Sequence, residues 1–469
     1  MANKSLNITQ KQIALGDPHN WTDNRDILSI RFAVYETLVS YAPDGTFMPC
    51  LAQSWNCSDD ACHWTFILRN SVFFHDGREL SAADVAACLE RVITPGMKGD
   101  LGTDGLYEAY LHGMSVEVTG EQSLTLHLTA PMADLLDILV YLPIIPADSF
   151  STITETAVGT GPYRFDSQQQ HTIRLVSNPK YWGEEAIYDA VVWQAEEDPE
   201  KRLQEISTGE AYISSDVSRR SLNAAGLAGI DQPSHWATII MLNCAQGVCV
   251  DKRVRQALNY AVDVPAMIDG LLDGAANPMV NPLTPVHNGF IQPEQTYHHN
   301  PAKAKALLHE AGFGNGMHLT LDIPTVHPDE SPVLAEMLKK QLADVGIELE
   351  IRPHDNRPAY SMMVRSKQIG DACIFDSSPL SSYRTLREKF HSGIKGPWWE
   401  GYHNPSVNQM METAWRTPQY EERTRLYQRV TQTIYEDAPW IFLYSPIFTW
   451  GISEKMQNWQ PTVHALVRV

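Results

Sequence analysis

Polar residues at 376–378, followed by Pro379, come after a short apolar run that ends at Phe375. The carboxylate of Asp376 can pair with a cation of a ligand, and the hydroxyls of Ser377 and Ser378 can donate hydrogen bonds to it. Ligands of open α/β sheets bind beyond the carboxyl ends of the strands. If residues 372–375 form such a strand, this segment is the best candidate site that the residue types alone supply.

A glycine-rich stretch at 159–162, Gly-Thr-Gly-Pro, raises the alternatives of a phosphate loop and a tight turn. A phosphate loop needs a Lys-Ser/Thr pair after its last glycine, or a helix that begins there. Here Pro162 follows, and residues 163–165 have the character of extended chain. We therefore predict a structural turn.

Signatures of catalysis and of metal binding are missing from the sequence. It has no GxSxG, HExxH or CxxCH motif, and the adjacent His298 and His299 are expected to form a surface pair. We predict no enzymatic activity, no cofactor and no metal site. Two pairs of cysteines could each close a short loop as a disulfide, or be small buried hydrophobic residues. These pairs are Cys57 with Cys62, and Cys244 with Cys249.

Trp398 stands beside a second indole, Trp399, in a segment that Gly396 and Pro397 introduce. Adjacent tryptophans in such a loop rarely both bury, which makes Trp398 a candidate ligand contact. Anchoring of the loop in the core is the competing interpretation.

The elements that must position these residues follow from local patterns. Alternating apolar residues at 64–68 predict a strand, Ser81 begins a capping box for a helix to about Ile93, and strands at 116–118 and 124–128 flank a turn. Later, helices capped by Asp251 and Asn300 precede strands at 319–323, 347–351 and 372–375. Helices from Ser331 to about 345 and at 359–367 separate these strands. Such a β-α-β-α-β series predicts a largely parallel sheet with Asp376 at its carboxyl edge.

Composition indicates a globular protein of two or three domains. The 469 residues are 43% hydrophobic and 20% charged, and their formal net charge is −20. This acidity disfavours nucleic acid and anionic membranes as partners. No run of about 18 apolar residues is present, and residues 1–5 are polar. The protein is therefore expected to be cytosolic, or to have had its leader replaced or removed.

The combined pattern resembles family 5 of the extracellular solute-binding proteins, the dipeptide-, oligopeptide- and nickel-binding receptors of ABC importers. The similar stretches are YETLV at 35–39, DG at 44–45, LAQSW at 51–55, WTFILR at 64–69, FHDG at 74–77, ADV at 83–85, GTGPY at 159–163, NPKYW at 178–182, VRQALNYAVD at 254–263 and AKAKALLHEAG at 302–312. They span nearly the whole chain.

The resemblance implies an α/β, periplasmic-binding-protein-like fold of the cluster C type, in which two lobes close on a ligand cleft about a hinge. By the family layout, the first lobe comprises 1–35, 158–245 and 440–469. An extra β-rich subdomain comprises 36–157, and the second lobe comprises 246–439.

The function implied is that of a periplasmic, monomeric receptor that delivers a small-molecule ligand to an ABC permease in the inner membrane. We expect a small polar or zwitterionic solute, such as a modified peptide, an opine-like compound or a metal chelate. The alternatives are a dipeptide/oligopeptide or nickel-chelate binding protein and, from other classes, a ligand-sensing regulator or an enzyme on the same fold. A regulator normally needs a DNA-binding module, for which the N-terminus has no room.

The resemblance also implies ligand contacts. By family position, Trp21 and Arg25 face the cleft from the first lobe, with Tyr107 contributed by the subdomain. Tyr383 and Arg384 follow Asp376, and an arginine there can grip a carboxylate bidentately. Peptide-binding relatives carry a Trp and an Asp-Pro pair after the corresponding strand, and Asp376 is displaced from that position. Residues 141–146 lack the arginine of nickel-type members, so the ligand is expected to differ from both usual classes.

Overall fold

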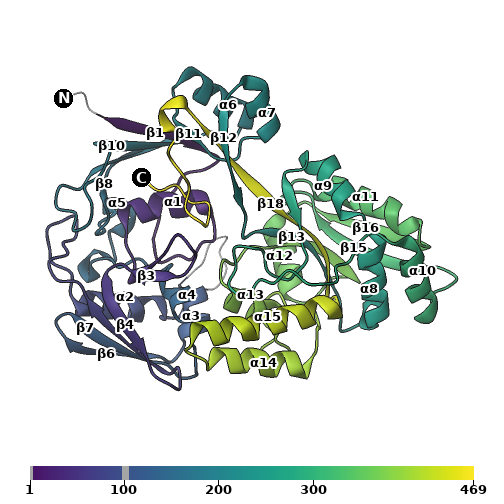
Figure 1. Cartoon of the computed structure of the whole chain (residues 1–469). Coiled ribbons are helices and arrows are strands. Elements are labelled where there is room, and N and C mark those ends of the chain that lie inside the picture. Colours follow the sequence, from purple (N-terminus) through teal and green to yellow (C-terminus); the bar gives the residue numbers. More distant parts are fainter. Residues whose placement is uncertain (1–3, 98–104) are drawn as a thin grey trace. The chain divides into compact units, whose positions relative to one another are not determined.

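The computed structural model describes residues 4–97 and 105–469, and the chain divides into two compact units (Figure 1). The first unit comprises Met1–Gln232, Trp415–Pro418 and Phe448–Val469, and the second comprises Pro233–Ala414 and Gln419–Ile447. The lobe boundaries predicted near 245 and 440 both lie inside the second unit of this division. The reason is that β13 (Ala237–Leu242) pairs there with the first half of β18 (Trp440–Ile452).

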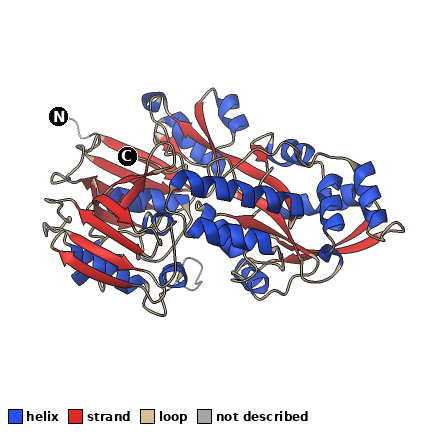
Figure 2. Ribbon diagram, turned by 60° about the horizontal axis from the view of Figure 1, so that its bottom comes forward, coloured by secondary structure: helices blue, strands red, loops and turns tan. Residues whose placement is uncertain are grey.

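The first unit mixes strands with short helices, and Figure 2 colours the helices and strands of both units. Its elements are β1 (Ser5–Gln10), α1 (Arg25–Val34), β2 (Val39–Tyr41), β3 (Phe47–Pro49), β4 (Ala52–Cys57), β5 (His63–Leu68), α2 (Ala82–Val92), α3 (Leu106–Leu111), β6 (Ser115–Gly120), β7 (Ser123–His127), α4 (Leu136–Leu139), α5 (Ile153–Thr156), β8 (Tyr163–Gln169), β9 (Thr172–Ser177), β10 (Ala190–Ala195), α6 (Pro199–Thr208), β11 (Ile213–Ser214), α7 (Arg219–Ala225), β12 (Ala228–Pro233) and the end of β18.

Two larger sheets and the two-stranded sheet of β2 and β3 organise the described part of the first unit. In the larger, β1 lies between β10 and β11 and is parallel to both, while β9 and β8 continue the sheet in antiparallel fashion. The smaller sheet has the order β4-β5-β7-β6, and α2 packs against β6 and β7. The predicted strand at 64–68, the capping box of Ser81 with Asp84, and the hairpin of β6 and β7 are all confirmed.

The second unit carries the alternating series. Its elements are β13, α8 (Lys252–Ala261), α9 (Val264–Leu272), β14 (Ala276–Pro278), α10 (Pro301–Glu310), β15 (Met317–Pro324), α11 (Ser331–Ala343), β16 (Ile347–His354), α12 (Arg357–Arg365), β17 (Ala372–Ser377), α13 (Ser382–Lys389), α14 (Pro405–Trp415), α15 (Tyr420–Asp437) and the start of β18.

The sheet of the second unit has the order β16-β15-β17-β13-β18. Its β15 is parallel to both β16 and β17, as the β-α-β-α-β pattern predicts. The sheet as a whole is mixed, because β13 runs antiparallel to β17 and to β18. The predicted helices are confirmed, and the side chains of Asp251 and Asn300 cap α8 and α10.

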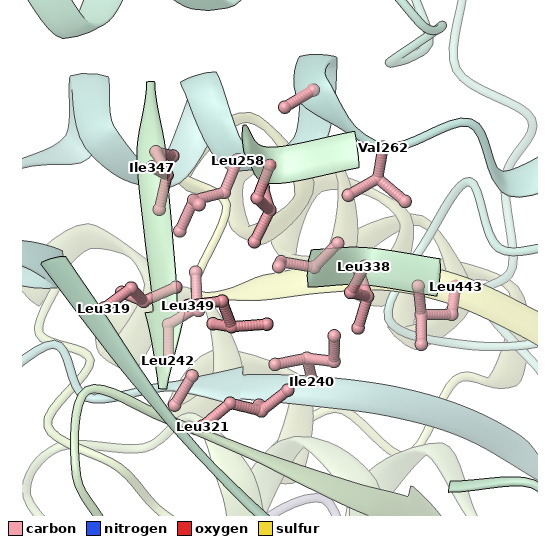
Figure 3. Close-up of a cluster of buried hydrophobic side chains, with 14 of the residues drawn as sticks. Ile240, Leu242, Leu258, Val262, Leu319, Leu321, Leu338, Ile347, Leu349 and Leu443 are labelled. Carbon is pink, nitrogen blue, oxygen red and sulfur yellow. The ribbon is translucent and has the colours of Figure 1, made fainter. Parts of the chain in front are cut away.

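The core of the second unit lies between this sheet and the apolar faces of its helices. Leu258 of α8 and Leu338 of α11 pack with Leu319, Ile347 and Leu349 from the strands, and all five are almost fully buried (Figure 3). Burial of such side chains is the main favourable term in folding. This packing holds the sheet in place, together with the edge at which Asp376 and its polar neighbours lie.

Among the described residues, no helix is long and apolar enough to cross a membrane. The structure holds the cysteines of both candidate pairs as thiols. In the second pair, Cys249 is fully buried, and burial raises the pKa of Cys244 to about 11. This pair therefore behaves as small hydrophobic residues.

Candidate functional site

An ion pair stands at the carboxyl edge of the parallel strands in the second unit. Arg357 Nη2 lies 2.8 Å from Asp376 Oδ1, and the two side chains are 13% and 12% exposed. Asp376 is near the end of β17, and Arg357 begins α12 directly after β16. The side chain of Asn356 accepts a hydrogen bond from the Ala359 amide and so starts the helix at that point. Because these strands are parallel, their ends meet at one edge.

Aromatic rings flank this ion pair. The guanidinium carbon of Arg357 lies 4.6 Å from the centroid of the Phe375 ring, which is itself 4.8 Å from the ring of Trp398. The sequence-predicted Trp398 is thus brought to the same place as Asp376. Its loop is tied down because the Trp398 amide donates to the Glu388 carbonyl oxygen at 3.3 Å.

Further cationic groups surround the Trp398 ring. Lys389 Nζ lies 5.8 Å from that ring and donates to the Asp376 carbonyl oxygen at 3.4 Å. The guanidinium of Arg365 is 5.9 Å from the same ring. In the group formed by Arg357, Lys389, Arg365 and Asp376, three side chains are cationic and one is acidic, so this group favours an anion.

A second carboxylate occupies the same edge. Glu330, just before α11, accepts hydrogen bonds from Thr238 Oγ1 at 3.4 Å and from the Tyr444 hydroxyl at 3.0 Å. Burial, followed by the charge of Glu330, raises the pKa of Tyr444. Thr238 is the strand partner of Asp376, which links this carboxylate to the ion pair. The two serines predicted beside Asp376 come directly after it in the chain. Ser377 is buried and Ser378 is half-buried.

Tyr383 and Arg384 lie in α13, and both are buried. Arg384 Nε is 3.2 Å from Glu388 Oε1 one turn along the same helix, and each side chain is only 3% exposed. The bidentate grip on a ligand that the sequence suggested would require this guanidinium to leave a buried partner, which is costly.

The first-unit candidates lie in aromatic surroundings. Trp21 meets the rings of Tyr107 and Tyr141, each at a centroid distance of 4.9 Å. The Tyr107 hydroxyl donates to the Tyr141 carbonyl oxygen at 2.6 Å. Trp21 and Tyr107 are therefore brought together, and both are buried. Such burial against other aromatic rings is typical of residues in a hydrophobic core.

Arg25 opens α1 and forms an ion pair with Asp216. Its guanidinium carbon lies 3.6 Å from the centroid of the Phe448 ring, a cation–π contact. Beside it, burial raises the pKa of Asp26 to about 6. The Nη1 atom of Arg25 is buried without a hydrogen-bond partner, so this side chain retains donor capacity.

In the glycine-rich stretch, the backbone packs directly against the backbone at the end of α1. A Cβ on Gly161 would lie 2.7 Å from the carbonyl oxygens of Ala33 and Val34, so only glycine fits. Thr160 Oγ1 donates to Glu36 Oε2 at 2.8 Å. Thr160 and Glu36, from two of the stretches that are similar to family 5, are thus joined at one buried carboxylate. Residues 160–162 bend directly into β8 and no helix begins there, as predicted for a structural element in place of a phosphate loop.

Arg357 and Glu330 were missed by reasoning from the sequence. A signal existed for Arg357, because Asn356 and Pro358 mark a helix start immediately after a predicted strand. No local signal marks Glu330, whose role depends on β13 and β18 pairing beside it.

Comparison with known proteins agrees with this architecture. The model of the bacterial extracellular solute-binding proteins, family 5 (middle), matches residues 46–383. The glutathione-binding protein GsiB of Shigella boydii is 28% identical over 451 residues, which are 91% of this chain and 85% of that protein. HbpA2 from Haemophilus parasuis is similar in structure, with a TM-score of 0.87, 21% identity, and coverage of 99% of this chain and 98% of that one.

NikA from Brucella suis, solved in complex with Fe(III)-EDTA, has a TM-score of 0.84 at 21% identity, with coverage of 99% of this chain and 98% of that one. These similarities confirm the two-lobed, periplasmic-binding-protein-like α/β fold.

Proposed function

This chain belongs to the bacterial extracellular solute-binding proteins, family 5, and on that basis we propose that it is the substrate-binding receptor of an ABC importer. Its ligand is a small zwitterionic solute with more carboxylates than ammonium groups, and a modified peptide of the glutathione type fits best. The importer's permease is its membrane partner. The receptor acts outside the cytoplasm as a monomer, without nucleic acid and without catalysis.

The observation that carries this proposal is the ion pair of Arg357 and Asp376, which is partly exposed at the sheet edge. A ligand carboxylate can take the guanidinium and a ligand ammonium can take the aspartate, so each charge exchanges one partner for another. Lys389 and Arg365 lie near the Trp398 ring, and their positive charges can attract a second carboxylate of the ligand.

The name of the relative GsiB supports the same class, because glutathione carries two carboxylates and one ammonium group. Ordinary peptides and nickel chelates form the second candidate class. It is favoured by the similarity to NikA, whose structure contains a metal chelate.

Capture follows from hinge closure of the two lobes. Closure excludes water from the bound solute, which strengthens its polar contacts. The ligand drives this closure only because it binds the closed state more tightly than the open state. Trp21, Arg25 and Tyr107 remain predicted contacts on the basis of family position. Tyr383 and Arg384 remain predicted contacts because they follow Asp376 in the chain.

The test is native mass spectrometry of the purified protein, followed by calorimetric titration with glutathione, a tripeptide of ordinary linkage, and nickel with histidine. We expect glutathione to bind most tightly. Tighter binding of the tripeptide or of the nickel chelate would overturn the solute class in favour of the second candidate. Turnover of any bound ligand would contradict the receptor itself.

A further inference from the structure

Two histidines stand opposite each other on the solvent-facing side of the small sheet in the first unit. His63 on β5 is the direct antiparallel partner of His127 on β7. Their neighbours Trp64 and Leu126 point inward and are buried. Side chains alternate along a strand, so the two imidazoles share the outer face. This face takes no part in the ligand site proposed above.

The ring nitrogens converge. His63 Nδ1 and His127 Nδ1 are 2.9 Å apart, and the ring planes meet at 71°. On the far side of the second ring, His127 Nε2 lies 3.2 Å from Glu117 Oε2, on the neighbouring strand β6. Donation of the Nε2 proton to this carboxylate leaves the His127 Nδ1 lone pair directed at His63.

We propose that His63 and His127 bind a divalent first-row transition-metal ion through their two Nδ1 atoms, with Glu117 as the positioning residue. Two nitrogens bound at about 2.0–2.1 Å and at a right angle to one another are about 2.9 Å apart. This is the separation observed. A tetrahedral angle would need about 3.4 Å. The pair therefore suits the tetragonal geometry of Cu²⁺ or Ni²⁺ better than that of Zn²⁺.

Binding requires a change of tautomer and a rotation of the two rings. The proton that His63 Nδ1 now shares with His127 moves to His63 Nε2, and the rings turn until both Nδ1 lone pairs, now directed along the line between the nitrogens, converge on the metal. Metal-bound histidine commonly donates its other N–H to a carboxylate, which raises its basicity and fixes its ring. Glu117 is already in that position. Across residues 4–97 and 105–469, no group of three or more His, Cys, Asp or Glu residues forms a metal site, so water completes the coordination.

The experiment is a titration of the full-length protein, free of any histidine tag, with Cu²⁺, Ni²⁺ and Zn²⁺ in a weakly coordinating buffer at pH 7.5. Isothermal calorimetry measures affinity, and electron paramagnetic resonance of the Cu²⁺ form reports its nitrogen ligands. We expect one Cu²⁺ site with two imidazole nitrogens, tighter than the Ni²⁺ and Zn²⁺ sites. His63→Ala and His127→Ala should each weaken Cu²⁺ binding at least tenfold. Glu117→Gln should weaken it about tenfold.

His318→Ala is the matched control. His318 is an exposed strand histidine that pairs with Glu350 at 3.4 Å, as His127 pairs with Glu117, but its pairing does not include a second imidazole. Its loss should leave Cu²⁺ affinity unchanged. Equal affinity in wild type and His63→Ala, an equal loss in His318→Ala, or a spectrum with fewer than two imidazole nitrogens would overturn the proposal.

Discussion

Glu36 and Thr160 are joined by a hydrogen bond of 2.8 Å, although 124 positions separate them in the chain. The Tyr181 hydroxyl and the Trp182 indole donate to the same carboxylate, each at 2.8 Å. Burial raises the pKa of Glu36 against these donors. Three of the stretches that are similar to family 5 therefore meet at one buried carboxylate of the first unit.

Replacement of Glu36 by alanine should lower the free energy of unfolding by about 2–4 kcal/mol, because the donors of Thr160, Tyr181, Trp182 and Cys50 lose their acceptor and a cavity is left. Urea denaturation at pH 7 measures this. Glu184→Ala, at an exposed glutamate on the same unit, is the control and should change stability by no more than about 0.5 kcal/mol. Similar losses in the two variants would contradict the structural role of Glu36.

Gly161→Ala should destabilise the protein by about 2–3 kcal/mol, since the added methyl group meets backbone oxygens that cannot turn away. In contrast, the nearest atom to a Cβ on Gly270, in α9, is Met337 Cε at 3.5 Å. Gly270→Ala should therefore be neutral or add up to about 1 kcal/mol. Thermal unfolding of both variants tests these two expectations. A Gly161→Ala protein as stable as wild type would show that the backbone at Gly161 does not pack tightly against Ala33 and Val34.

His75 makes stability depend on pH. It accepts a hydrogen bond from the Gly159 amide at Nδ1 and contacts the Gly161 carbonyl oxygen through Nε2. Burial lowers the pKa of His75 to about 4, whereas the unfolded chain takes up this proton near 6.5. The folded state is therefore favoured above about pH 6.5 and loses this stability as the pH falls towards 4.

In His75→Gln, the free energy of unfolding should fall less steeply between pH 6.5 and 4.5, by up to about 1.4 kcal/mol per pH unit. Denaturation series on wild type and variant give the difference directly. The difference isolates this histidine, because both proteins keep His19, whose pKa burial also lowers to about 4. Parallel pH profiles would mean that His75 is protonated equally in the folded and unfolded states.

The elements that local chemistry determines were predictable. Ser81, Asp251 and Asn300 stand before apolar residues with helical spacing, and each begins a helix in the structure. Alternation at 64–68 was likewise sufficient to predict a strand, because side chains of that strand face the core and solvent in turn.

The contacts at the candidate site were harder to predict from the sequence. Asp376 was identified from its place after a strand, but its partner Arg357 comes from a different element, and their contact requires the order of strands in the sheet. Arg384 shows the opposite case. Its spacing of four from Glu388 is visible in the sequence, yet the two pair only because residues 382–389 form a helix, which the sequence reasoning did not predict.

The central claim is that the solute binds at the carboxyl edge of β17. Calorimetric titration of glutathione into Asp376→Asn tests it most directly, with Glu350→Gln as the control at an exposed carboxylate that also pairs with an arginine. We predict that Asp376→Asn weakens binding at least thirtyfold, about 2 kcal/mol or more, and that Glu350→Gln binds as wild type. Unchanged affinity in Asp376→Asn, while wild type binds, would contradict the claim.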